Sequence, residues 1–231
     1  MRTIPALYEK MDAWGMLDYR DSRYLWVFDM KWIPVKKLSP EPEIYVGDIP
    51  LTTFARGMGG DYWCFLPDAG GAEPAVCFCE HTEPEGSFFA SSLPDAIFRE
   101  IVFYGSTACF DDAPTTSPAN VVAPANVVAP ANVVAPANVV APANVVASNE
   151  EAAHALFRQY AERLKNILND KQIAILKELA KKPLTWQTTP YGEWHALLSD
   201  VEVDQILSAA IQSPKPPLPF PIRWTEDECE V

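Results

Sequence analysis

The sequence has few histidines and few basic residues, and it has no long hydrophobic run. In 231 residues, 3 His and 18 Lys or Arg stand against 31 Asp or Glu, which gives a formal net charge of −13. A chain this acidic repels nucleic acid backbones and anionic membranes. No stretch approaches the ~18 apolar residues of a membrane span, and the N-terminal residues lack the apolar core of a signal peptide. We therefore expect a cytoplasmic protein that binds neither nucleic acid nor membrane.

Familiar catalytic motifs are also missing from the sequence. It contains no GxSxG, HExxH or GxxxxGKS/T pattern, and Tyr62 stands where a dinucleotide fingerprint starting at Gly57 would need its third glycine. The histidines lie outside any indicative motif, and we expect structural roles for His154 and His195. Carboxylates could act as a general acid and base, but they are too common for spacing to identify a pair; the candidates are Asp61, Glu80, Glu83, Glu85, Asp111 and Asp112. We expect no catalytic residue and no cofactor, while a small hydrolase remains an alternative.

Cysteines are few and odd in number, which argues against a disulfide framework. Four of the five lie within apolar runs and are expected to be reduced core thiols. Cys77, Cys79 and His81 would share one face of an extended strand, with Cys64 on the neighbouring strand. Alternate strand positions lie about 6.5–7 Å apart, which is awkward for one zinc ion with sulfur ligands at ~2.3 Å. We expect no metal site.

A tandem repeat divides the chain. Residues 118–147 are five identical copies of PANVVA. Proline at every sixth position removes a ladder donor and blocks a continuous helix. The hexad loosely resembles a β-helix repeat, but five copies make fewer than two coils and cannot bury their valines. We therefore interpret residues 117–147 as a flexible insertion between an α+β domain over residues 1–116 and a helical region over residues 148–213.

Strand patterns dominate the first region. Alternation and β-branched or aromatic content predict strands over residues 24–30, 44–46, 62–66 and 75–80. Helical spacing predicts a short helix over residues 7–14 and a longer one over 93–104, the second capped by Ser91 and Ser92. These elements predict an α+β fold with a central, mostly antiparallel sheet flanked by helices and followed by a helical C-terminal extension.

Three amphipathic helices are predicted after the repeat. Capping-box spacing starts one at Ser148 and another at Ser199, and Asp170 is the expected cap of a helix over residues 171–182. They could pack on each other or on the sheet. Residues 214–231 form a Pro-rich acidic tail. Its PxxP arrangement could dock in a partner's groove through Phe220 and Trp224, or the tail could lie on its own domain.

The segment around residue 60 combines a glycine-dense turn with an aromatic strand. Gly57, Gly59 and Gly60 allow positive φ and close backbone approach, and Asp61 can close the turn by accepting from backbone amides. The acids that follow in the sequence, Glu80, Glu83 and Glu85, are expected on the surface. Asp61 is either a turn-stabilising residue or, with these three, part of a contact surface for a partner.

A family resemblance follows from the order of short motifs between residues 30 and 104. The chain resembles the SMI1/KNR4 (SUKH) superfamily in an apolar-Pro strand, a Gly-Asp turn that enters an aromatic strand, and a "phe-ala" strand before a helix; these motifs are Ile49-Pro50-Leu51, Gly59-Gly60-Asp61-Tyr62, Phe65 and Phe88-Phe89-Ala90-Ser91-Ser92, with Trp32-Ile33, Phe54-Ala55, Pro74-Ala75-Val76 and Ile97-Phe98. The repeat and the Pro-rich tail depart from the family pattern.

The resemblance implies a non-catalytic protein-binding module. Many bacterial members are immunity proteins that neutralise a cognate toxin, often a nuclease, and others are interaction scaffolds. The acidic balance fits a basic toxin domain as the partner, because complementary charge speeds association. We therefore expect a protein partner, and a scaffold protein is the alternative role.

Overall fold

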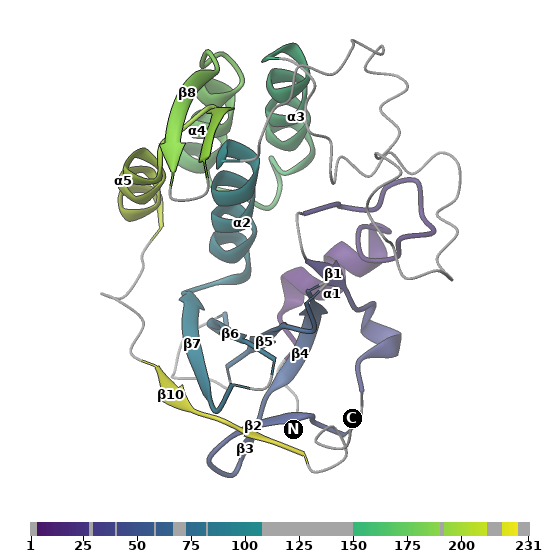
Figure 1. Ribbon diagram of the computed structural model, residues 1–231. Coiled ribbons are helices and arrows are strands. Elements are labelled where there is room, and N and C mark those ends of the chain that lie inside the picture. Colours follow the sequence, from purple (N-terminus) through teal and green to yellow (C-terminus); the bar gives the residue numbers. More distant parts are fainter. Residues whose placement is uncertain are drawn as a thin grey trace. The chain divides into compact units, whose positions relative to one another are not determined.

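The computed structural model describes residues 4–27, 30–39, 41–57, 59–66, 73–81, 83–107, 150–189, 192–211 and 219–225 (Figure 1). The repeat and the cap predicted at Ser148 lie outside these residues, as do Asp111 and Asp112. The chain divides into two compact units. The first is Met1–Ala96 with Ile211–Val231, and the second is Ile97–Ala210.

The first unit confirms the predicted α+β class. Its main sheet has six strands in the order β1-β4-β5-β6-β7-β10, and every neighbouring pair is antiparallel. The strands are β1 (Lys31–Trp32), β4 (Thr52–Arg56), β5 (Tyr62–Phe65), β6 (Val76–Cys79), β7 (Glu85–Ala90) and β10 (Phe220–Pro221). A second sheet has the order β11-β2-β3, from β11 (Arg223–Trp224), β2 (Ile44–Val46) and β3 (Ile49–Pro50).

One face of the six-stranded sheet carries an aromatic cluster beneath helix α1 (Ala6–Ala13). Tyr8 of this helix is fully buried, and its ring centre lies 5.7 Å from that of Phe54 and 5.5 Å from that of Phe65. Its hydroxyl lies 2.7 Å from the carbonyl oxygen of Ile33 and 2.8 Å from that of Phe54. The helix is therefore fixed on the sheet by ring packing and by a hydroxyl that needs a buried acceptor.

The other face packs against the three-stranded sheet. Strand alternation places Tyr62, Cys64, Cys77 and Cys79 on this face, because Tyr62 pairs with Cys79 and Cys64 pairs with Cys77. These side chains form one buried cluster with Ile44, Leu51 and Ile222. Both faces of the central strands are thus covered, which explains why all four residues of β5 are buried.

The second unit contains most of α2 (Leu93–Thr107), then α3 (Glu150–Arg163), α4 (Asp170–Leu179), the strands β8 (Thr185–Thr189) and β9 (Gly192–Ala196), and α5 (Asp200–Ala210). The predicted helices are confirmed, and Ser199 caps α5 with Glu202 as its capping-box partner. The cap predicted at Asp170 is wrong by one residue. Asn169 caps α4, because its side chain accepts from the amide of Gln172 and the Gln172 side chain bonds back to Asn169.

Two further features differ from the sequence predictions. β8 and β9 form an antiparallel hairpin that the sequence analysis missed. The strand predicted over residues 24–30 is wrong in its described part: the Met30 amide donates to the Val27 carbonyl at 3.1 Å, so the chain reverses there with an isolated bridge. Trp32 Nε1 donates to the Leu25 carbonyl at 2.6 Å and fixes this reversed segment.

No helix in the described part of the chain is both long and apolar enough to cross a membrane.

Candidate functional site

The glycine-dense turn between β4 and β5 is closed mainly by backbone contacts. The Gly57 amide donates to the Asp61 carbonyl at 2.7 Å, and Gly60 has a φ of +92°. A Cβ on Gly60 would lie 3.2 Å from Cγ of His81. Gly60 is therefore required both for its left-handed backbone and for close approach to the next turn.

Asp61 links this turn to the one between β6 and β7. Its Oδ1 accepts from the backbone amide of His81 at 2.9 Å, and the Glu83 amide donates to the Glu80 carbonyl at 3.2 Å. We call Glu80, His81, Glu83, Pro84 and Glu85 the acidic turn. Asp61 is partly buried, while Glu80, Glu83 and Glu85 are exposed. The structure thus brings the four predicted acids to one end of the sheet, with Asp61 in a turn-stabilising contact.

A segment near the C-terminus also bonds to the backbone of the acidic turn. We call residues 219–225 the C-terminal strap, and it runs along both sheets of the first unit as β10 and β11 (Figure 1). The Ile222 amide donates to the Pro84 carbonyl at 2.9 Å, and Trp224 Nε1 donates to the Glu83 carbonyl at 2.9 Å. For these residues, the alternative in which the tail lies on its own domain is the one found.

The position of Trp224 differs most from what the sequence predicts for this site. Its ring centre lies 5.3 Å from that of Tyr62 and 6.0 Å from that of His81. The PxxP pattern of the tail predicts Trp224 only as a possible anchor in a partner's groove. The alternation of Phe220, Ile222 and Trp224 is a period-two signal that predicts a strand, although it does not show which strand it pairs with.

Arg56 lies over the ring of Tyr62 and is paired with an acid of the same chain. The Arg56 guanidinium lies 5.0 Å from the ring centre of Tyr62 and forms an ion pair with Glu43. The carbonyl of Glu43 in turn accepts from the amide of Thr225 at 3.0 Å. Arg56 therefore links neighbouring strands, and none of the ion pairs among the described residues involves a glutamate of the acidic turn.

The three described cysteines lie together in the core, in the cluster that the second sheet covers. The Cys77 thiol donates to the Cys64 carbonyl at 3.6 Å, and burial raises the pKa of both thiols. Hydrogen bonds from Cys64 and Cys77 lower the pKa of Cys79 to about 5. His81 is exposed at the turn. Across the described ranges, no group of three or more His, Cys, Asp or Glu side chains could hold a metal ion.

Of the two histidines expected to be structural, His154 has a described contact. Its Nε2 lies 2.7 Å from the Lys182 carbonyl, so it joins α3 to the segment after α4. His195 belongs to β9, and its side chain is outside the described part of the structure.

Comparison with known proteins gives no relative: no family model, curated protein or solved structure matches the chain. The site defines an α+β module that presents carboxylates on an anchored turn. The family resemblance stays a prediction from the sequence motifs.

Proposed function

We propose that this chain is a non-catalytic, cytoplasmic protein-binding module that neutralises a basic partner, as immunity proteins of the family it resembles neutralise toxins. The observation that carries the proposal is the anchoring of the acidic turn. Three exposed glutamates stand on a backbone that is held by Asp61 on one side and by Ile222 and Trp224 on the other.

Anchoring matters for affinity because a binding surface that is already ordered loses less conformational entropy when the partner binds. The exposed carboxylates attract a basic surface over several ångströms and raise the association rate, an effect that salt screens. The overall charge of −13 adds to this attraction. A nuclease domain, which must bind a polyanion, offers the matching basic surface.

The direct test measures whether this chain protects cells from a toxic partner. The product of the gene next to this chain's own gene is expressed with and without this chain, and cell survival and complex formation are measured at low and high salt. We expect survival only in the presence of the chain, with a complex that weakens as salt rises. Equal killing in both cultures, with no complex at low salt, would contradict the proposal.

A charge-matched pair of variants locates the surface. The triple variant Glu80→Gln, Glu83→Gln and Glu85→Gln removes three exposed charges from the acidic turn. The control triple Glu9→Gln, Glu151→Gln and Glu178→Gln removes three exposed charges elsewhere. We expect the first to slow association at least about tenfold and the control less than about threefold. Equal effects would show that only net charge matters, and would remove the acidic turn from the proposal.

A further inference from the structure

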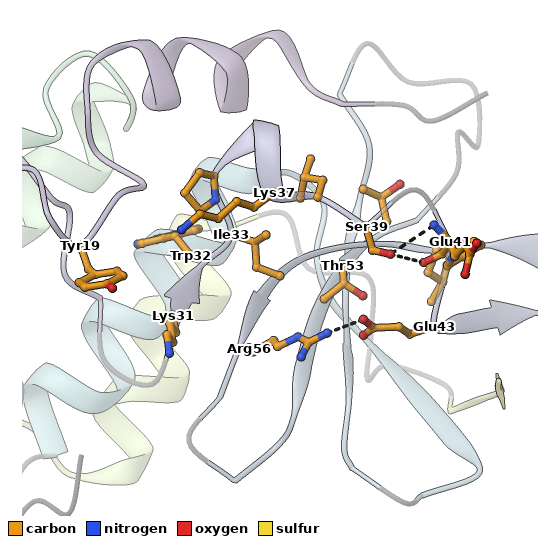
Figure 2. A pocket seen from close by; sticks show the side chains of 15 residues that line it. Tyr19, Lys31, Trp32, Ile33, Lys37, Ser39, Glu41, Glu43, Thr53 and Arg56 are labelled. Atoms are coloured by element: carbon orange, nitrogen blue, oxygen red, sulfur yellow. Dashed lines mark hydrogen bonds and ion pairs between the residues drawn. The ribbon is translucent and has the colours of Figure 1, made fainter. Parts of the chain in front are cut away.

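A groove of about 340 Å³ lies on the first unit, between the 3₁₀ turn η1 (Val35–Lys37), the strands β1 and β4, and the segment that leads into β2 (Figure 2). Its walls combine aromatic and aliphatic side chains with three cationic ones. The residues that matter here are Tyr19, Lys31, Ile33, Lys37 and Arg56. This volume falls in the range of small-molecule sites, which pair apolar walls with a few charged or polar groups.

Two cations of the groove, Lys31 and Arg56, lie close enough to repel each other, which lowers the local stability of the sheet. Lys31 and Arg56 are direct partners on adjacent strands, so their side chains leave the same face of the sheet. Like charges in this position repel each other, which disfavours the strand pairing. Glu43 offsets Arg56 through its ion pair. No described residue forms an ion pair with Lys31 or Lys37, and both lysines are exposed.

The charge in the groove is also unevenly distributed. Figure 2 shows Lys31 near Tyr19 at one end, while Glu41 and Glu43 lie at the other. Ser39 Oγ donates to the Glu41 carbonyl at 2.7 Å and shapes the acidic end. A ligand with an anionic group would therefore be oriented, with that group toward Lys31 and its apolar body along the walls.

We propose that this groove binds a small organic anion, whose carboxylate or phosphate is held by Lys31 and Lys37 and whose planar apolar body packs beside Tyr19 and Ile33. The bound anion relieves the repulsion between Lys31 and Arg56, and the apolar walls supply contact area that inorganic ions cannot use. The groove contains none of the residues of the acidic turn, although Arg56 and Glu43 also contact Tyr62 and the C-terminal strap. The test of anion binding has its own readout, so its result does not decide the proposed function.

The test uses four small probes and ligand-observed NMR titration of the full chain. Benzoate and phenyl phosphate share an apolar ring and differ in the anionic group, benzamide is the neutral analogue of benzoate, and inorganic phosphate lacks the ring. We expect saturable binding of benzoate, phenyl phosphate or both, at least about fivefold tighter than benzamide and inorganic phosphate. The preferred anion identifies the carboxylate or phosphate as the natural head group.

Neighbouring lysines supply the control variants. Lys36 and Lys37 belong to the same 3₁₀ turn and are both exposed, but only Lys37 lines the groove. We expect Lys31→Met and Lys37→Met each to weaken binding of the preferred probe about fivefold to tenfold, and Lys36→Met and Lys31→Arg to change it less than twofold. Thermal unfolding of each variant checks that the fold is kept.

Three results would overturn the proposal. Benzamide that binds as tightly as benzoate would remove the role of charge. Inorganic phosphate that binds as tightly as phenyl phosphate would remove the apolar walls. Lys36→Met that weakens binding as much as Lys37→Met would show attraction to general positive charge and no defined site.

Discussion

Gly86 of β7 provides the sharpest test of how the C-terminal strap is held. Phe220 pairs with Gly86 in the ladder, and a Cβ at position 86 would lie 2.9 Å from Phe220 Cε2 and 3.1 Å from Ile222 Cγ2. Carbon atoms in favourable contact lie about 3.5–4.0 Å apart. The change Gly86→Ala therefore forces the Phe220 and Ile222 side chains, or the strap that carries them, to move by about half an ångström or more.

The expected cost combines two opposing effects. Overpacking by one methyl group costs about 1–3 kcal/mol, while replacement of glycine at an ordinary φ restricts the unfolded chain and returns about 0.4–1 kcal/mol. We expect Gly86→Ala to lower the free energy of unfolding by about 1–2 kcal/mol, measured by denaturant titration. Gly59→Ala is the matched control. Gly59 also has an ordinary φ, and a Cβ at this position would lie 3.3 Å from its nearest neighbour, Asp61 Oδ2. Gly59→Ala should cost less than about 0.5 kcal/mol.

A double-mutant cycle separates the clash from other effects. Phe220→Ala alone loses the packing of a partly buried ring, and it also makes room for a methyl group at position 86. The double variant should therefore be at least about 1 kcal/mol more stable than the sum of the single changes implies. Additivity within about 0.5 kcal/mol would refute the packing of the strap on β7.

Labelling of the cysteine thiols tests whether Gly86→Ala loosens the strap where the strap covers the core. Cys64, Cys77 and Cys79 are buried in a cluster with Ile222 and against Phe220 and Trp224. Loosening of the strap should therefore expose them to iodoacetamide, followed by peptide mass spectrometry under native conditions. Faster labelling in Gly86→Ala than in Gly59→Ala is expected. Identical rates would show that the strap does not cover these thiols.

Two further predictions follow from single contacts. Asp61→Ala removes the acceptor of the His81 amide and should cost about 1 kcal/mol of unfolding free energy, while Asp61→Asn keeps an acceptor and should cost less than about 0.5 kcal/mol; equal costs would contradict the structural role of Asp61. The ion pair with Lys182, together with the Ser199 amide, lowers the pKa of Glu202. The charged form of Glu202 therefore stabilises the fold above pH 4.5, the ordinary pKa of this carboxyl, and this stabilisation is lost as pH falls below 4.5. The stability difference between the wild type and Glu202→Gln, measured by thermal unfolding, should therefore shrink between pH 6 and pH 3, and a constant difference would contradict this linkage.

Local patterns predicted much of the fold because their signals lie within a few residues. Helical spacing and capping chemistry identified α1, α2, α4 and α5, and alternation identified β2, β5 and β6. The prediction over residues 24–30 failed because an aromatic, β-branched run has strand propensity even where the chain reverses. The β8–β9 hairpin was missed because no Asn-Gly or Asp-Gly signal marks its turn.

The contacts of the candidate site could not be predicted from any short stretch of the sequence. Gly59, Gly60 and Asp61 indicate a turn by their own chemistry, yet the partner of Asp61 is 20 residues away and the partner of Trp224 is 141 residues away. Such pairings depend on the order of strands in the sheet, which the sequence does not show. The exposed glutamates could therefore be named from the sequence, whereas the contacts that fix them could not.

The strap connects stability to the proposed function. Because Ile222 and Trp224 bond to the backbone of the acidic turn, a change that loosens the strap should also loosen the glutamates without altering their charge. Gly86→Ala and the triple glutamine variant then affect partner binding in different ways. The first should weaken binding while its salt dependence stays the same, because the charges remain and ordering them costs more entropy. The second should reduce the salt dependence itself, because fewer charges are left to screen. If both variants change binding and its salt dependence alike, preorganisation of the turn contributes nothing, and charge alone governs recognition.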